Sequence, residues 1–491
     1  AWGVTAYDCS PGVYTFTLNA SGLAEQTYTA TLHAVNDSGD TTLQFNVIVS
    51  SDVSQGSTPT PGPTPAPTPG GATPADSIVA PSTAPTPAAP AGGSYTEVTP
   101  PEVVTKWYLN TLTNPQYWRE NATGLHDSSG DTNDPPTGRR ADWPVPFPYK
   151  ATRSHDRSDS KLVAALQWAR LNPTEDVYDF DRLKEWIDDN TGKFLVFTLF
   201  GTPVFAQRYP GESWGYGYMS GGASSALPGK ITKFLNAMFA WLNTEYGSNK
   251  IDVLEFWNEP NVRWQDSDAD NDRQSPAKGA QKFWRGTGNE YADNAIEAGE
   301  ACPSDVGYAL GAWEGQSGDN DAHVLAKALT RMDALGKLGL ITVWSFHIYT
   351  YKGAAEWWKT PDEALAYITR MDSFGLGAPT LKINSEQGAE YSDGTGADGS
   401  SRLSDWTSAQ RGEWIRRVVV SQLALGVDQV YLYTYRAADN ELPPDDTNVI
   451  AAFQWLDDNA GSWLYRVGRT VSNKLYLGFI DPDGVQRDVV I

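Results

Sequence analysis

The chain has 491 residues, of which 40% are hydrophobic and 20% charged, so it carries enough apolar material for a large packed core. Its formal net charge of −23 argues against nucleic acid and anionic membranes as partners, because binding to phosphates needs clustered Lys and Arg. The two cysteines, Cys9 and Cys302, are too few for a disulfide framework, and none of the five histidines lies in an HExxH arrangement. We therefore expect no metal and no other cofactor.

Residues 1–52 alternate polar and apolar side chains in short runs, with a turn-like Asp-Ser-Gly-Asp at 37–40. Alternation of period two between turn residues is typical of antiparallel strands. The segment is short for an independent sandwich, which usually needs about 100 residues. It resembles the last strands of a bacterial immunoglobulin-like module, so we interpret it as a partial β-sandwich. The chain opens without a basic segment followed by an apolar stretch, which indicates a processed or truncated precursor.

Residues 53–94 are rich in Pro and Thr, and Asp76 is their only charged residue. Proline at this density prevents helix and ladder formation and favours an extended, semi-rigid spacer. Linkers of this composition commonly join the modules of secreted polysaccharide-degrading enzymes. We therefore expect an extracellular location.

Residues 95–462 alternate short apolar runs with helical patterns, which favours the α/β class with a parallel sheet. No GxGxxG or P-loop sequence accompanies the runs, so a (β/α)₈ TIM barrel is favoured over a nucleotide-binding fold. The expected helices are 181–190, 230–244, 321–335 and 409–425. The expected later strands are 193–200, 251–257, 306–312, 341–347, 380–384 and 427–434.

The start of the barrel is open, because three runs precede residue 193: 103–109, 149–153 and 162–168. One of these three is surplus to an eight-stranded count. After the barrel, residues 463–491 resemble strands with a turn at Asp481-Pro482-Asp483-Gly484, which suggests the start of a truncated sandwich.

The strongest chemical signal is Phe256-Trp257-Asn258-Glu259-Pro260-Asn261, which follows an apolar strand directly. A second carboxylate, Glu386, also ends a predicted strand. Functional residues of a (β/α)₈ barrel lie at the carboxyl ends of its strands, so we expect these two glutamates to face the same opening. Glu314 and Glu390 are the alternatives to Glu386.

This pattern resembles clan A glycoside hydrolases, in which Asn-Glu ends the fourth strand and a nucleophilic glutamate ends the seventh. Within that clan the likeness is to glycoside hydrolase family 39 and related family-5-like enzymes, and it covers roughly residues 143–436. The resemblance implies a retaining glycosidase with Glu259 as acid/base and Glu386 as nucleophile. It also implies that Asn258 hydrogen-bonds the sugar 2-hydroxyl. Such chemistry needs two carboxylates, one to protonate the leaving oxygen and one to attack the anomeric carbon.

The resemblance implies further substrate-site residues, each of which could instead be barrel packing. Arg153 would keep a carboxylate ionised, His155 is a weaker possibility, and His347 and Tyr349 lie on the sixth strand. The eighth strand carries Tyr433 where the clan commonly has Trp, which leaves the sugar open. Rings that could stack on sugars are Trp143, Trp168, Trp264, Trp313, Tyr433 and Tyr435.

The acidic stretch 266–272 resembles a calcium loop but lacks its sixth-position glycine and twelfth-position glutamate, so we interpret it as a solvated loop. The sequence thus predicts a monomeric retaining glycoside hydrolase acting on a polysaccharide or oligosaccharide. The alternative is a carbohydrate-binding barrel without catalysis.

Overall fold

The computed structural model describes residues 26–36, 39–49, 97–112, 115–126, 148–154, 166–209, 224–261, 284–314, 319–350, 356–373, 381–389, 406–433, 442 and 446–491. The chain divides into two compact units, residues 1–75 and 76–491. In the first unit, β1 (Gln26–Asn36) pairs antiparallel with β2 (Gly39–Val49), with Gln26 opposite Val49. This hairpin is what the period-two alternation predicts for these residues.

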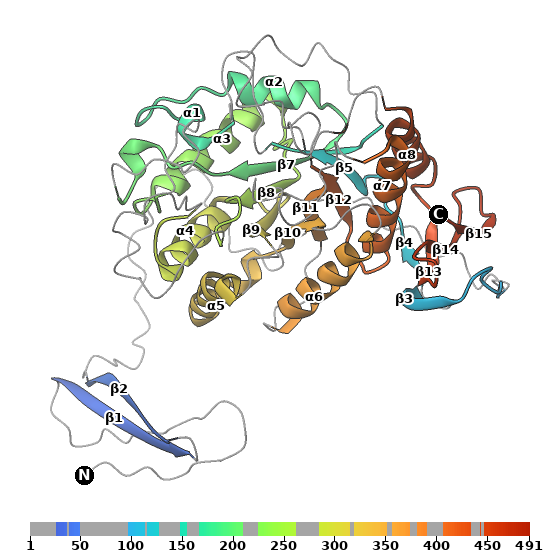
Figure 1. Ribbon diagram of the computed structural model, residues 1–491. Helices are drawn as coiled ribbons and strands as arrows, with labels where there is room; N and C mark the ends of the chain where they lie inside the picture. Colours follow the sequence, from blue (N-terminus) through green and yellow to red (C-terminus); the bar gives the residue numbers. More distant parts are fainter. Residues whose placement is uncertain are drawn as a thin grey trace, which may run out of the picture. The chain divides into compact units, whose positions relative to one another are not determined.

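The second unit contains a closed barrel of eight parallel strands, which confirms the predicted TIM barrel (Figure 1). Its later strands fall where the apolar runs predict them. The barrel strands in chain order are β5 (Thr123–His126), β6 (Ala151–Arg153), β7 (Phe194–Leu199), β8 (Val253–Phe256), β9 (Gly307–Glu314), β10 (Val343–Thr350), β11 (Leu381–Ala389) and β12 (Gln429–Leu432).

The first barrel strand is β5, which none of the three early runs anticipates. Only the run at 149–153 enters the barrel, as β6. The run at 103–109 lies in another sheet, and the run at 162–168 ends in a helix that begins at Trp168. β5 is short and contains Gly124, where a Cβ would come within 2.5 Å of the Tyr431 ring on β12. The glycine leaves room for that ring, so the strand lacks a continuous apolar run.

Helices follow the strands and cover the outside of the barrel (Figure 1). The four predicted helices correspond to α2 (Asp181–Asp189), α3 (Lys230–Tyr246), α5 (Asp319–Ala334) and α7 (Ser408–Leu423). Capping boxes at Thr287 and Thr407 begin α4 (Gly288–Ala301) and α7. The described helices are α1 (Trp168–Leu171), α2 (Asp181–Asp189), α3 (Lys230–Tyr246), α4 (Gly288–Ala301), α5 (Asp319–Ala334), α6 (Lys359–Ser373), α7 (Ser408–Leu423) and α8 (Thr447–Asp458). Among these helices, none is long and apolar enough to span a membrane.

A second sheet draws its strands from both ends of the second unit, in the order β15-β14-β13-β3, and β4 also pairs with β13. The predicted boundary at residue 463 therefore falls between strands of one sheet, and the tail completes this sheet instead of starting a separate sandwich. The sheet packs beside the last helices, where Arg417 of α7 donates to the Ile491 carbonyl (3.0 Å). Its strands are β3 (Val104–Asn110), β4 (Gln116–Tyr117), β13 (Trp463–Thr470), β14 (Leu475–Ile480) and β15 (Gln486–Val490).

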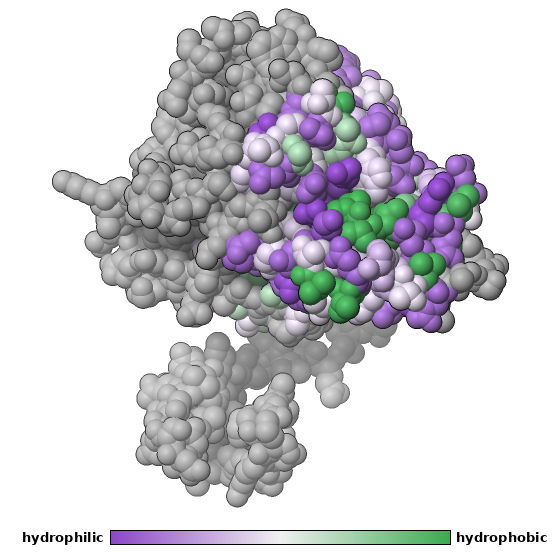
Figure 2. All heavy atoms as spheres, turned by 45° about the vertical axis from the view of Figure 1, so that its right-hand side comes forward, coloured by the Kyte–Doolittle hydropathy of each residue, from purple (hydrophilic) through white to green (hydrophobic). Residues whose placement is uncertain are grey.

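The face that carries this sheet is mostly hydrophilic, with small apolar groups between the polar residues (Figure 2). Two of its most exposed apolar residues, Val103 and Val471, are neighbours, because the Val471 N–H donates to the Val103 carbonyl (2.8 Å). The main hydrophobic core lies between the barrel strands and the helices and continues under the second sheet through Leu464, Val467 and Leu477. The sheet and the barrel thus share one core.

Candidate active site

Side chains inside the barrel alternate with those that face the helices. On β8, Val253 belongs to the cluster inside the barrel, whereas Leu254 and Phe256 belong to the outer core. Glu255 therefore points inward, above Val253 and towards the carboxyl ends of the strands. The inner apolar cluster consists of Ala151, Phe194, Val196, Val253, Ala309, Val343, Leu381, Ile383 and Tyr431.

The residues that follow β8 are held in an irregular backbone. Trp257 has φ +70° and Glu259 has φ +44°, both in the left-handed region. This region costs a non-glycine residue about 1–2 kcal/mol. The Trp257 N–H donates to the Leu199 carbonyl (2.8 Å) on one side, and the Glu259 N–H donates to the Ala312 carbonyl (2.8 Å) on the other. Bonds to both neighbouring strands thus stabilise a strained turn that presents Glu259, and such strain concentrates at functional sites.

A β-bulge positions Glu386. Ile383 lies in the inner cluster, so strict alternation would point Ser385 inward and Glu386 towards the helices. The register between β10 and β11 instead shifts by one residue at Ser385. Both side chains consequently face the interior, where the Ser385 hydroxyl lies 2.6 Å from that of Ser345 and Glu386 lies beside His347. Bulges are frequent next to active sites because they redirect a side chain in this way.

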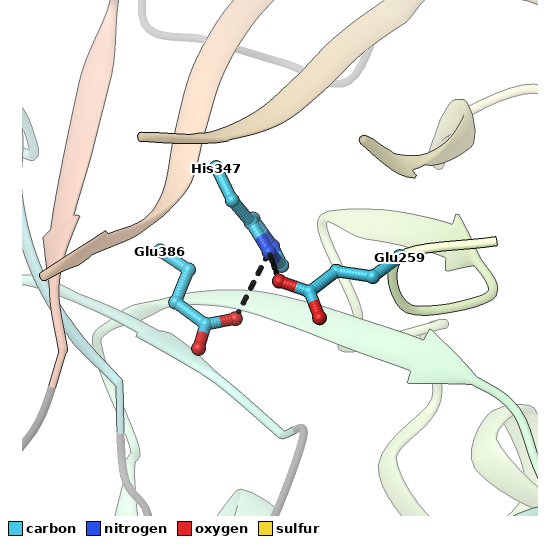
Figure 3. Close-up of side chains that lie close together, drawn as sticks. All are labelled: Glu259, His347 and Glu386. Atoms are coloured by element: carbon cyan, nitrogen blue, oxygen red, sulfur yellow. Dashed lines mark hydrogen bonds and ion pairs between the residues drawn. The ribbon is translucent and has the colours of Figure 1, made fainter. Parts of the chain in front are cut away.

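Glu259, His347 and Glu386 converge at the carboxyl end of the barrel (Figure 3). His347 Nδ1 is 2.8 Å from Glu259 Oε1 and 3.1 Å from Glu386 Oε2. A carboxylate oxygen of Glu259 and one of Glu386 lie within 4.8 Å of each other. His347 is fully buried, and the side chains of Glu386 and Glu259 are only 7% and 14% exposed. Two carboxyl groups thus face one small space and share an imidazole.

Arg153, at the end of β6, hydrogen-bonds both Glu255 and Glu386. Its guanidinium is fully buried and donates from Nε (2.7 Å) and Nη2 (2.5 Å) to Glu255 Oε1. It also donates to Asn258 Oδ1 (2.7 Å) and to Glu386 Oε2 (3.1 Å). Since Asn258 accepts from Arg153 through Oδ1, its Nδ2 is the group left to donate to a ligand.

Arg153 donates hydrogen bonds to two carboxylates, Glu255 and Glu386, whose surroundings differ. Burial by itself raises the pKa of the Glu255 carboxyl, but the charge of Arg153 and the hydrogen bonds from Ser345 and Arg153 outweigh burial and hold that pKa below its ordinary value. Glu255 is therefore an anion inside the barrel. Arg153 donates to both Glu255 and Glu386, and charge-assisted bonds of this kind favour the ionised form of each carboxylate.

Glu259, His347 and Glu386 are also the one group of three potential metal ligands among the described residues. Arg153 argues against a bound cation, because its Nη1 lies 3.1 Å from Glu386 Oε2, the oxygen that also approaches His347. A divalent ion on that oxygen would sit close to a fixed guanidinium charge, and the repulsion weakens such a site. The arrangement is better suited to proton transfer between an acid and an anion.

The structure brings together five of the residues that the sequence suggests: Glu259, Glu386, Asn258, Arg153 and His347. The prediction that Trp168 binds substrate is wrong. Trp168 begins α1, is 1% exposed and packs against Phe234 of α3 with ring centroids 5.6 Å apart.

Trp313 is likewise buried and packs against Tyr291 at 5.5 Å, so it belongs to the core. Tyr433 follows β12 at the same end of the barrel as Glu259 and is half-buried, and its role stays a prediction. For Tyr349 and Glu314 the structure gives only the backbone, in β10 and β9. Several predicted residues lie outside the described residues: Trp143, His155, Trp264, the acidic loop 266–272, Glu390 and Tyr435.

The sequence analysis does not single out four polar residues that form a network in the interior: Glu255, Thr198, Ser345 and Ser385. Ser345 donates to Glu255 Oε2 (2.5 Å), and Ser385 Oγ lies 3.2 Å from His347 Nε2. A signal exists for Glu255, because a carboxylate at an inward position of an otherwise apolar strand needs a buried partner. No comparable signal marks the serines, which are common in strands.

Neither a known protein-family model nor a curated protein sequence matches the chain. The solved structures similar to it include the catalytic domain of GH30 xylanase C from Talaromyces cellulolyticus, with 12% identity, TM-score 0.45, and coverage of 78% of this chain and 86% of that one. SrfJ from Salmonella typhimurium has 12% identity and TM-score 0.44, with coverage of 81% and 87%. The intracellular xylanase TsXylA from Thermoanaerobacterium saccharolyticum has 13% identity and TM-score 0.41, with coverage of 69% and 99%.

Proposed function

We propose that this protein is a retaining glycoside hydrolase that cleaves O-glycosidic bonds of a neutral or weakly charged polysaccharide or oligosaccharide. The observation that carries the proposal is the pair Glu259 and Glu386, with carboxylate oxygens within 4.8 Å of each other at the barrel mouth. Retaining glycosidases place their carboxyl groups about 5–5.5 Å apart, whereas inverting enzymes leave about 6.5–9.5 Å for a water molecule. The short separation favours double displacement.

In the first step, protonated Glu259 gives its proton to the glycosidic oxygen while Glu386 attacks the anomeric carbon. The bond between that carbon and the leaving oxygen breaks, and the released alcohol carries the proton away. Glu386 is then esterified to the sugar, and Glu259 is ionised. The environments suit these roles, because Arg153 favours the anionic form of Glu386 and Glu259 lies next to the His347 imidazole.

In the second step, ionised Glu259 takes a proton from water, and the water oxygen attacks the anomeric carbon from the side that the leaving group vacated. The ester bond to Glu386 breaks, so the product keeps the starting configuration and both carboxyl groups return to their initial states. Asn258 would donate from Nδ2 to the sugar 2-hydroxyl, a bond that can strengthen as positive charge develops.

A carbohydrate-binding barrel without catalysis would use the same opening, but a binding protein has no need of a strained Glu259 backbone or of a bulge that turns Glu386 inward. The strained backbone costs stability that binding through aromatic rings would not require. The remaining predictions extend the proposal: a place in family 39, action as a monomer, and an extracellular location suggested by the Pro/Thr spacer.

The test combines a screen on defined glycans with a 2-deoxy-2-fluoro glycoside of the sugar that is cleaved. We expect the reagent to label Glu386, and we expect Glu386→Gln to abolish turnover while the fold is retained. The configuration of the first product, followed by NMR, should be retained. A label on Glu314 or Glu390, or an inverted product, would contradict the assignment.

A further inference from the structure

A chain of hydroxyl groups links the buried carboxylate of Glu255 to His347. Ser345 Oγ lies 2.5 Å from Glu255 Oε2 and 2.6 Å from Ser385 Oγ, and Ser385 Oγ lies 3.2 Å from His347 Nε2. Glu255, Ser345, Ser385 and His347 are all completely or almost completely buried. These hydrogen bonds link side chains from three barrel strands, β8, β10 and β11, and lead towards the two proposed catalytic carboxyls, Glu259 and Glu386.

The direction of these hydrogen bonds follows from counting protons. Arg153 and Thr198 donate to Glu255 Oε1, so Glu255 is held as an anion that only accepts. Ser345 has one hydroxyl proton and must give it to Glu255. Ser385 must then donate its own single proton to Ser345, so towards His347 it can only accept.

His347 must therefore carry a proton on Nε2, and in the neutral ring Nδ1 has only a lone pair. We infer that Ser345 and Ser385, oriented by the Glu255 anion, are positioning residues that hold His347 as the Nε2–H tautomer. Nδ1 then accepts a hydrogen bond from the protonated carboxyl of Glu259. This inference rests on the proposed function for its purpose, but the tautomer itself is a property of the free protein.

The tautomer matters because Nδ1 faces both carboxyl groups, at 2.8 Å from Glu259 and 3.1 Å from Glu386. An Nδ1–H ring would donate a proton and favour two ionised carboxylates, which is the wrong state for an acid catalyst. An Nδ1 lone pair instead favours a proton on Glu259. Among the described residues, Glu255 and Arg153 are further charged groups near the ring, and on β9 the residue in register with His347 is Glu314.

Replacing Glu255 with Gln should reverse the direction of the hydrogen bonds between residue 255 and His347. The Gln carbonyl would face the donors Arg153 and Thr198, so its amide N–H₂ would face Ser345. Ser345 would then accept from the amide and donate to Ser385, and Ser385 would donate to His347 Nε2. The ring would become the Nδ1–H tautomer. An isosteric change about three hydrogen bonds away would thus move a proton from one ring nitrogen to the other.

The experiment is ¹⁵N NMR of the full chain with labelled histidine rings, with the His347 signals assigned by their loss in His347→Gln. We expect the Nε2–H tautomer in the unsubstituted protein and Nδ1–H in Glu255→Gln. In Ser385→Ala, which keeps the charges of the site, we expect the strong preference for Nε2–H to be lost. Ser421→Ala is the matched control, because Ser421 is equally buried but bonds only to carbonyls of its own helix.

Kinetics supply a second readout. Since Ser385 acts through the acid proton, Ser385→Ala should reduce kcat about 10-fold or more on a substrate with a poor leaving group. It should have little effect with a dinitrophenyl leaving group and little effect on KM. An Nδ1–H ring in the unsubstituted protein, a doubly protonated ring from about pH 5 to 8, or an unchanged tautomer in both variants would overturn the inference. Absence of any glycosidase activity with the expected tautomer would instead overturn only the proposed function.

Discussion

Arg153 gives the sharpest test of how the barrel interior is held together. Arg153→Met removes a fully buried cation and, among the described contacts, four hydrogen bonds that it donates: two to Glu255 and one each to Asn258 and Glu386. Glu255 would then be a buried carboxylate without its ion-pair partner. Breaking a buried pair from one side costs about 3–5 kcal/mol, because the remaining charge is left uncompensated. We expect the free energy of unfolding to fall by about that amount at neutral pH.

The loss should depend on pH in a known direction. With Arg153 present, the pKa of Glu255 lies below its ordinary value, so the pair stabilises the fold above the ordinary pKa, and that contribution is lost as pH falls through the lowered one. In Arg153→Met, burial raises the pKa of Glu255, so protonation on acidification restores stability to the variant. The difference between the two proteins should therefore shrink from about pH 8 to about pH 5.

The assay is urea denaturation at several pH values, with Arg153→Met/Glu255→Met as the second arm. Replacing both members of a buried pair with apolar side chains is often neutral, so the double variant should regain most of the lost stability. It should not regain activity, because Glu386 and Asn258 still lack Arg153. A double variant no more stable than the single one, or a single variant within about 1 kcal/mol of the unsubstituted protein, would refute this account.

Three further outcomes follow from the described contacts. Glu259→Ala should cost about 10²–10⁴-fold on natural oligosaccharides but much less on dinitrophenyl glycosides, and azide should rescue the latter as a glycosyl azide of retained configuration; equal losses without rescue would remove Glu259 as the acid. Burial raises the pKa of Asp252 to about 6, although the hydrogen bond that it accepts from the Leu195 N–H lowers the pKa. The charge of Asp252 therefore destabilises the fold above that pH, and protonation at lower pH removes the penalty. Asp252→Asn should therefore gain up to about 3 kcal/mol over the unsubstituted protein near pH 8 and nothing near pH 4, as urea denaturation would measure; a gain independent of pH would contradict the burial argument. Residues 95–491, which keep the Glu97 bond to Arg466, should retain the melting temperature and the activity of the full chain on small substrates, and a large loss of either would show that residues 1–94 stabilise the barrel.

The sequence predicts the later barrel strands well, because each is a compact apolar run between helical patterns. It fails at the first strand, because Leu125 is the one described side chain of β5 that belongs to the core. The strand is defined instead by its pairing with β12 and β6. The sequence also assigns no partner to the run at 103–109. That run pairs with β13, more than 350 residues later, and no local pattern encodes such a pairing.

The carboxylates themselves could be predicted from their places at strand ends, but not the geometry that brings them together. Glu386 is on the inner side only because of the bulge at Ser385, and Glu259 faces the mouth only because Trp257 and Glu259 adopt positive φ. Neither feature involves glycine, so the residue types give no warning of it. Strain of this kind depends on hydrogen bonds from neighbouring strands, which exist only once the barrel has closed.

The sharing of Arg153 between two carboxylates has a consequence for the proposed reaction. Glu386 loses its charge when it forms the ester, and a guanidinium paired with Glu386 alone would then be a buried cation without a partner, which would oppose the step. Arg153 instead makes its two shortest carboxylate contacts to Glu255 and a longer one of 3.1 Å to Glu386. Glu255 keeps its charge throughout, so the guanidinium stays neutralised while Glu386 passes from anion to ester and back. In the proposed reaction, the buried Glu255 would thus let Arg153 favour an ionised Glu386 without holding it so strongly that attack is suppressed.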